Sequence, residues 1–364
     1  MLPGSPSRSV TSAGTSTSNS SPSTSSAPIS RSITRTACSA IRRPSSARAA
    51  LTRACWKTPK PEADGRSHTM TPRSLARLNK STTGRLMRAG IRALDALAPD
   101  SAQRLAFDWF GTPIRRRDEP PFILGHRFRI VGDGPELAVW DWGDGPTVLL
   151  AHGWNGNGAQ LAGFVPPLLR AGYYVAAPDL PAHGASAGTR SNVRAMADAL
   201  LRVGRRVGPV HAVIAHSLGA AAAAIALAEG LRTSRAVLIA PPANLPRYAQ
   251  EFARIVGLSP RSTSGLLTRL DRALGGRAAF DLLRLAELQK ARALILHDPG
   301  DREVPLADAQ AIAKAWPRAR LETLAGAGHT RALRHPEVIS RAVEFVAGPP
   351  EPLVDSTEPL GLSA

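Results

Sequence analysis

The sequence predicts an α/β protein built on a doubly wound, mostly parallel sheet of about eight strands. Short apolar segments alternate with longer segments of helical character between residues 128 and 347. That alternation is the pattern of repeated strand–helix–strand units. Residues 147–151 are also continuously apolar, as expected of a strand covered on both faces.

Eight segments are expected to be strands because they are short, apolar and bounded by turn-forming residues. They are residues 128–131, 137–142, 147–151, 173–177, 210–214, 235–240, 293–296 and 319–324. The first two flank a Gly-rich turn and suit an antiparallel hairpin leading into the sheet. Helices are expected at residues 161–171, 192–207, 220–228 and 336–347.

The alternation stops between the sixth and seventh predicted strands. Three helical stretches replace it, at residues 247–258, 262–274 and 277–290. Before the sheet, residues 72–98 carry leucines at near-helical spacing with arginines between them, interrupted by Gly84 and Gly90. Residues 101–110 follow as one more short helix.

The candidate nucleophile is Ser217, in the segment Ala-His-Ser-Leu-Gly at residues 215–219. A strand precedes this segment and an alanine-rich helix follows it, which makes it a tight strand-to-helix turn. A serine in such a turn has strained backbone geometry, and small residues two positions before and after it let strand and helix pass closely. Its hydroxyl is then expected to project over the sheet edge.

Partners for this serine occur in a specific order along the chain. Asp301 and His329 each follow a predicted strand, and a His-Gly-Trp-Asn-Gly loop at residues 152–156 follows the third strand. The order Ser217, Asp301, His329 resembles the α/β-hydrolase fold superfamily over roughly residues 137–346. One departure from its Gly-x-Ser-x-Gly motif is Ala215 in place of the first glycine. The segment at residues 243–290 resembles that superfamily's helical cap, inserted after the sixth strand.

The resemblance implies a role for each of these residues. Ser217 would be the nucleophile, His329 the base that takes its proton, and Asp301 the acid that fixes the imidazole tautomer. The backbone N–H groups of Trp154 and Leu218 would form the oxyanion hole.

Other residues near these motifs receive supporting or structural roles. His152 and Gly153 are expected to position the oxyanion loop. Asp298 is the alternative acid, but Asp301 is favoured because Asp-x-x-Val-Pro continues as the superfamily's acid loop does. His183, His297 and His335 are expected to be hydrogen-bonded loop or surface residues, whereas His216, next to the nucleophile, is expected to point elsewhere along the turn.

These residues favour a serine hydrolase, which would cleave a carboxylic ester or thioester of a small acyl substrate through an acyl-enzyme on Ser217. An acyltransferase using the same three residues is the first alternative. A non-catalytic ligand-binding or signalling protein that retained the fold is the second.

Composition divides the 364 residues into four parts. Residues 1–69 are rich in Ser, Thr, Pro and Arg without a period, so we expect them to be disordered, as a transit peptide or an over-extended start before Met70. Residues 70–120 are expected to be a helical extension, and residues 121–348 the α/β-hydrolase domain with its cap at residues 243–290. Residues 349–364 are expected to be a flexible tail.

The net charge of +18 does not indicate a nucleic-acid partner. Residues 1–69 hold ten basic against two acidic residues, and the remaining arginines are dispersed among acids without interleaved aromatic residues. Cys38 and Cys55 both lie in that first segment, so neither a disulfide nor a cysteine metal site is expected in the catalytic domain. No cofactor is expected, and no metal is expected because no histidine or carboxylate pair sits at helix spacing with a third ligand nearby.

A cytoplasmic location is expected, because no secretory signal or membrane-spanning run is found in the sequence. Import into an organelle would follow if residues 1–69 were a genuine transit peptide. The basic amphipathic stretch at residues 72–98 could contact an anionic membrane, although packing onto its own domain is more common.

Overall fold

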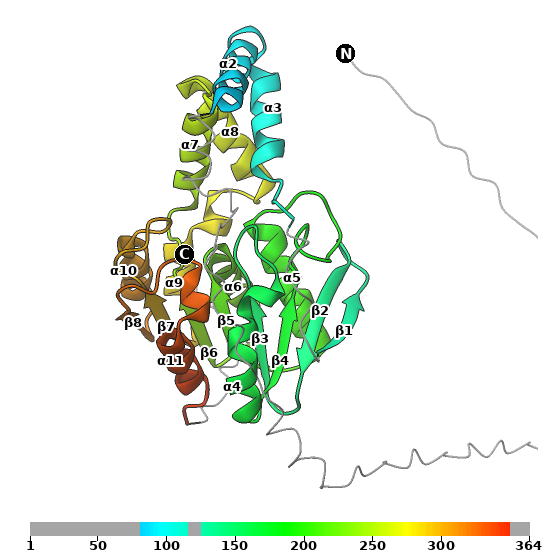
Figure 1. Ribbon diagram of the computed structural model, residues 1–364, viewed down its shortest axis with the longest axis vertical. Helices are drawn as coiled ribbons and strands as arrows, with labels where there is room; N and C mark the ends of the chain where they lie inside the picture. The colour runs from blue at the N-terminus through cyan, green and yellow to red at the C-terminus, as the bar shows by residue number, and fades with distance from the viewer. Residues whose placement is uncertain (1–80, 116–124, 350–364) are drawn as a thin grey trace, which may run out of the picture. The chain divides into compact units, whose positions relative to one another are not determined.

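The computed structural model describes residues 81–115 and 125–349. The predictions for residues 1–80, including the segment with both cysteines, lie outside the described residues, as does the tail from residue 350. Within the described residues the predicted eight-stranded, mostly parallel sheet is confirmed, with the order β1-β2-β4-β3-β5-β6-β7-β8 (Figure 1).

Two antiparallel strand pairs open the sheet, and every later pair is parallel. The strands are β1 (His126–Ile130), β2 (Leu137–Trp142), β3 (Thr147–Ala151), β4 (Tyr174–Pro178), β5 (Val210–His216), β6 (Arg235–Ile239), β7 (Arg292–His297) and β8 (Ala319–Thr323). Strands β3 and β6 are buried along their whole length, which accounts for the apolar runs at residues 148–151 and 236–239. The first residue of each strand, Thr147 or Arg235, is polar and also buried.

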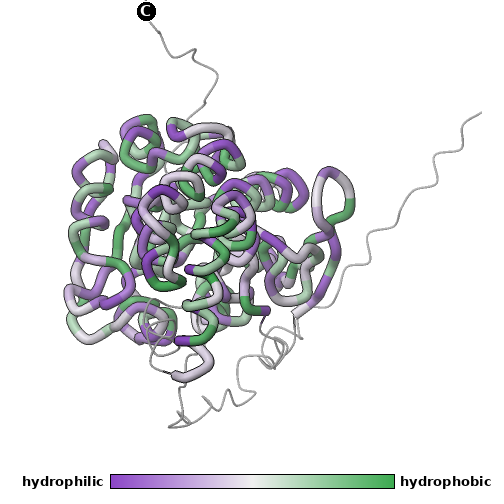
Figure 2. Tube along the Cα trace, turned by 90° about the horizontal axis from the view of Figure 1, so that it is seen from above, coloured by the Kyte–Doolittle hydropathy of each residue, from purple (hydrophilic) through white to green (hydrophobic). Residues whose placement is uncertain are grey.

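Helices cover both faces of the sheet and enclose two apolar cores. One face carries α5 (Val193–Val207), α6 (Leu218–Ala228), α9 (Leu282–Glu287) and α10 (Leu306–Ala315). The other carries the 3-10 helices η2 (Gly158–Phe164) and η4 (Arg331–Arg334) with α4 (Val165–Arg170) and α11 (Pro336–Val346). In Figure 2 hydrophobic and hydrophilic residues alternate along many of these helices, as expected when one side of a helix is buried.

A third apolar core lies away from the sheet, among four helices that Figure 1 shows together. These are α2 (Thr82–Leu97) and α3 (Pro99–Phe110), which precede the sheet, and α7 (Leu245–Val256) and α8 (Pro260–Ala273), which follow β6. Ile91 and Ala106 of the first pair are buried against Phe252 and Leu266 of the second. The helices that precede the sheet therefore share a core with the cap. A short 3-10 helix, η3 (Arg277–Phe280), follows α8.

Several helices differ from the sequence-based expectation for identifiable reasons. The helix expected at residues 161–171 is a 3-10 helix followed by α4, because Pro166 and Pro167 at its start lack N–H donors. The helix expected at residues 277–290 is split into η3 and α9 at Asp281, whose carboxylate caps α9. Helix α2 continues through Gly84 and Gly90, and α10 was not anticipated.

The register of the parallel strands brings distant loops together. Ala151 of β3 pairs with Ala215 of β5, and His216 pairs with Ile239 of β6. Because the carboxyl ends of parallel strands meet at one edge of the sheet, the loops that follow them meet there too.

Candidate active site

Ser217 joins β5 to α6 in a strained conformation. Its φ of 52° and ψ of −126° are rare for a residue with a side chain. Close packing enforces this turn: a Cβ on Gly219 would overlap the carbonyl oxygen of His152 and lie 2.8 Å from that of Ala151. Ala215, in contrast, is fully buried with its methyl accommodated. Glycine is thus required at position 219, two residues after the serine, whereas alanine is tolerated at position 215, two residues before it.

The three residues predicted to act together are in hydrogen-bonding contact. The Ser217 Oγ lies 3.0 Å from Nε2 of His329. The other ring nitrogen, Nδ1, lies 2.7 Å from Oδ2 of Asp301. Because a carboxylate only accepts, Nδ1 carries the proton and Nε2 is left to accept the serine hydroxyl proton.

The carboxylate of Asp301 is completely buried but well supplied with donors. Its Oδ1 accepts the backbone N–H of Glu303 at 2.8 Å and that of Val304 at 3.1 Å. Burial acts to raise the pKa of Asp301, but the hydrogen bond from His329 and those two amides outweigh it and hold the pKa below its usual value. The side chain is therefore an anion in a fixed orientation.

Asp298, the alternative acid, has a different task. Its Oδ1 accepts the N–H of Gly300 at 2.8 Å and that of Gly326 at 3.2 Å, and its Oδ2 accepts the N–H of Gly328 at 2.5 Å. Burial opposes ionisation, yet these amide hydrogen bonds hold the pKa of Asp298 below its usual value. Asp298 thus ties the loop before His329 to the loop that carries Asp301, and it is Asp301 that contacts the imidazole.

The amides of Trp154 and Leu218 are available beside the serine. Among the described residues neither N–H has an internal hydrogen-bond acceptor, and Leu218 is the first residue of α6. The loop around Trp154 is fixed by a hydrogen bond from Gly156 N–H to the Gly153 carbonyl, 3.1 Å long. A Cβ on Gly153 would be only 3.0 Å from the Ser217 Cβ, so glycine permits this approach.

Two buried histidines position this loop as neutral rings. His152 donates from Nδ1 to the Gly153 carbonyl at 2.8 Å and accepts the Leu180 N–H at Nε2 at 2.9 Å. His183 donates from Nδ1 to the Pro181 carbonyl at 2.8 Å and accepts the Asn155 N–H at 3.2 Å. Burial lowers the pKa of His152 to about 4 and that of His183 to about 3.

His216 is closer to the site than its sequence position suggested. Its Nε2 donates to the His329 carbonyl at 3.2 Å, and the two ring centroids are 4.7 Å apart. Burial and the neighbouring His329 hold the pKa of His216 well below its usual value, so the ring is neutral. The expectation that it points away from the site was wrong, because the turn at Ser217 directs residues 216 and 217 towards the same loop.

Glu303 was not singled out from the sequence. Its Oε2 lies 3.9 Å from Nε2 of His329, so it adds a second carboxylate beside the imidazole. The only sequence signal was its position two residues after Asp301.

His297 and His335 do not belong to the hydrogen-bonded chain from Ser217 to Asp301, although the Nε2 of His297 lies 4.0 Å from Oδ2 of Asp301. His297 is buried and its Nε2 donates to the Val304 carbonyl at 3.0 Å, which supports the loop that carries Asp301. His335 precedes α11. Residues 81–115 and 125–349 contain no cluster of three histidine, cysteine or acidic side chains that could hold a metal ion. In the same ranges no helix has the length and apolarity needed to cross a membrane.

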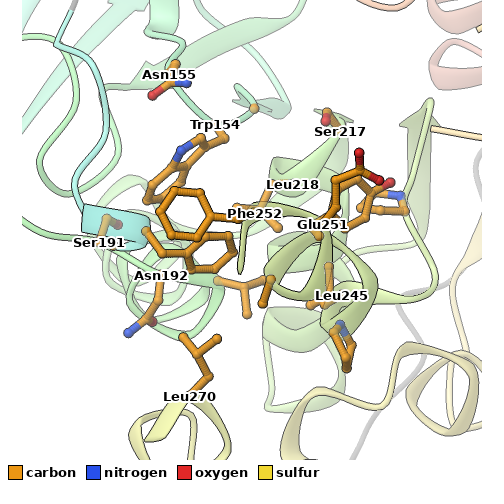
Figure 3. A pocket seen from close by; sticks show the side chains of 18 of the residues that line it. Trp154, Asn155, Ser191, Asn192, Ser217, Leu218, Leu245, Glu251, Phe252 and Leu270 are labelled. Atoms are coloured by element: carbon orange, nitrogen blue, oxygen red, sulfur yellow. The ribbon is translucent and has the colours of Figure 1, made fainter. Parts of the chain in front are cut away.

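A cavity of about 380 Å³ opens next to Ser217. Figure 3 shows Ser217 and Trp154 at one end of this pocket and Leu270 at the other, with Phe252 between them (Figure 3). Its walls are mainly apolar and come from the sheet edge, the cap and the end of α3. The contribution of α3 was not anticipated from the sequence.

The fold is that of an α/β hydrolase. The profile of the alpha/beta hydrolase family matches residues 148–342, and the chain belongs to that family. The comparison with curated proteins found no match.

Among solved structures, this chain is similar to the esterase Pf2001 of Pyrococcus furiosus, with 22% identity and a TM-score of 0.51 over 64% of this chain and 98% of that one. It is also similar to a bromoperoxidase from Bacillus anthracis, with 20% identity and a TM-score of 0.47 over 61% and 99% of the two chains. The thioesterase domain of the curacin biosynthetic pathway has 17% identity and a TM-score of 0.45 over 61% and 98%. At these identities the similarity concerns the fold.

Proposed function

We propose that this protein is a serine hydrolase that cleaves a carboxylic ester or thioester through an acyl-enzyme on Ser217. The observation that carries the proposal is the continuous chain of hydrogen bonds from Ser217 through His329 to Asp301, at 3.0 and 2.7 Å. Hydrogen-bonded nucleophile, base and orienting acid are the requirement for activating a weakly nucleophilic hydroxyl.

In the first half-reaction Ser217 Oγ forms a bond to the substrate carbonyl carbon while its proton passes to Nε2 of His329. The carbonyl oxygen becomes an oxyanion that accepts the N–H groups of Trp154 and Leu218. The bond to the leaving alcohol or thiol then breaks, and the leaving group takes the proton from His329. The positive end of α6 and the Asp301 carboxylate stabilise the oxyanion and the imidazolium, respectively.

In the second half-reaction water replaces the alcohol or thiol. His329 takes a proton from the water, the resulting oxygen attacks the acyl carbon, and Ser217 leaves with the proton returned to its Oγ. We assign to the strained turn at Ser217 the role of holding the Oγ between the base and the two amides throughout. An acceptor alcohol or amine in place of water would make the same residues an acyltransferase.

Labelling with a fluorophosphonate and turnover of p-nitrophenyl esters test the proposal. The wild-type protein should be labelled and should hydrolyse an activated ester. Ser217→Ala and His329→Ala should each lose nearly all turnover, and the double variant should be little worse, since the losses within one catalytic unit are not additive. Wild-type-like turnover by Ser217→Ala would refute the assignment. Absence of both labelling and turnover would favour a non-catalytic ligand-binding protein. A ratio of hydrolysis product to acyl-transfer product that changes with the concentration of an added acceptor would favour acyl transfer.

A further inference from the structure

The helices that precede the sheet contribute to the pocket beside Ser217. The family profile begins at residue 148, so α2, α3 and the segment up to residue 115 lie before the matched region. Phe107, Trp109 and Phe110 of α3 nevertheless line the same cavity as Ser217 and His329. The pocket is therefore incomplete without this N-terminal extension.

The aromatic residues of α3 form one wall with the cap. The ring of Trp109 meets that of Phe252 of α7 edge-on, with centroids 5.4 Å apart. Phe110 lies on Phe252 as well, at 5.3 Å. Edge-on and tilted aromatic pairs at this separation are attractive beyond their buried area. The wall is thus a packed surface with a defined position.

Polar contacts anchor the extension to the cap. The buried carboxylate of Asp95 accepts the Ser259 N–H at 2.7 Å and the Ser262 hydroxyl, at the start of α8. Arg269 of α8 reaches Asp100 at 3.1 Å. A buried carboxylate held by two donors restricts how α2 and α3 can shift relative to the cap.

Further contacts anchor the end of the extension to the catalytic body. The N–H of Ser191 donates to the Gly111 carbonyl at 2.8 Å. The Ile114 N–H donates to Oδ1 of Asn155 at 2.7 Å, and Asn155 directly follows Trp154. The extension therefore contacts both the cap and the loop whose amide is proposed to bind the oxyanion.

The lining of the cavity specifies the chemistry of its occupant. Leu218, Leu245 and Leu270 line it together with the aromatic wall. Its acidic residues are Glu251, Asp271 and Glu303, of which Glu251 is ion-paired with Arg254 and Asp271 with Arg277. Arg190 is a lining cation, and it is already ion-paired with Asp108 of α3. An anionic acyl group would find no unpaired cation among these lining residues, so a neutral apolar chain fits best.

We propose that α3 is a specificity element, which forms one wall of the acyl pocket and selects esters or thioesters with long neutral apolar acyl groups. This inference rests on the proposed function. The cavity of about 380 Å³ exceeds what an acetyl group requires and falls in the range of roughly 300–1,000 Å³ that binds small ligands.

The test compares p-nitrophenyl acetate with p-nitrophenyl octanoate for the wild type, Trp109→Ala and Leu105→Ala. Leu105 is the control because it lies on the same helix but is 46% exposed and does not line the cavity. The wild-type kcat/KM should rise roughly fourfold for each methylene that the pocket buries. Trp109→Ala should lose at least about tenfold on octanoate and little on acetate, because the missing wall affects only the longer chain. Leu105→Ala should match the wild type on both esters.

Equal losses on the two esters in Trp109→Ala, or no loss on either, would overturn the proposal. If Trp109→Ala does not fold, Phe107→Ala carries the same comparison and the same two outcomes. Binding of 2-decanone to Ser217→Ala, measured by calorimetry, separates the two proposals because it requires no turnover. If adding Trp109→Ala weakens this binding at least about tenfold, the result supports the proposed acyl pocket even if no ester is hydrolysed. Absence of binding, or binding indifferent to Trp109, refutes the pocket even if Ser217 is catalytic.

Discussion

The orientation of the Asp301 carboxylate leads to a sharp prediction for Asp301→Asn. The backbone amides of Glu303 and Val304 both donate to Oδ1, so an asparagine keeps its oxygen there and turns its NH₂ towards His329. Nδ1 of the imidazole must then accept, which places the ring proton on Nε2, 3.0 Å from the Ser217 Oγ. In that tautomer His329 cannot accept the serine proton, and we expect kcat to fall by up to about 10⁴, equivalent to about 5.4 kcal/mol.

The matched control for this substitution is Asp298→Asn on the same loop. Asp298 contacts glycine amides, so the amide group would lose one hydrogen bond to the loop before His329 without changing the imidazole tautomer. We expect a loss of roughly tenfold from a small displacement of His329. Initial rates on one activated ester, with circular dichroism as the check on folding, decide the matter. A larger loss in Asp298→Asn, or a loss below tenfold in Asp301→Asn, would refute the reasoning.

Three further predictions concern stability. Gly219→Ala should lower the free energy of unfolding in urea by about 3 kcal/mol or more and abolish turnover, since its Cβ would overlap the His152 carbonyl; unchanged stability would contradict the packing argument. Gly90→Ala, with nothing within 4 Å of the added methyl on α2, should instead stabilise by up to about 1 kcal/mol, and destabilisation would show that α2 is packed differently. The native pKa values of about 4 for His152 and about 3 for His183 lie below the unfolded value of 6.5, so the unfolded chain binds protons first. Stability should therefore be fully present above pH 6.5 and fall as the pH drops towards 4, by up to about 1.4 kcal/mol per unit for each histidine. His183→Gln should reduce that slope in chemical unfolding measured from pH 7 to 5, and an unchanged slope would contradict its assignment as a buried neutral ring.

Much of this fold can be read from local sequence. A strand buried on both faces is apolar along most of its length, so β3 and β6 were recognisable although Arg235 begins β6. A tight turn between strand and helix needs small neighbours, which identified Ser217 as the candidate nucleophile. The order of the motifs along the chain also predicted Asp301 and His329 as the partners of Ser217. Each of these features depends on a few adjacent residues or on the order of motifs.

The remaining features depend on contacts between residues far apart in the chain, which only the tertiary structure determines. Asp301 and Asp298 have the same chemistry and lie on one loop, and the side-chain directions alone decide that the first meets His329 and the second meets glycine amides. His216 contacts His329 because β5 ends with His216 at the edge of the sheet where the loop that carries His329 also lies. The wall from α3 arises from a shared core with the cap, whose residues lie well over a hundred positions later in the chain. Local sequence patterns determine which helix or strand forms. The topology and the packing of its faces determine which distant residues that helix or strand contacts.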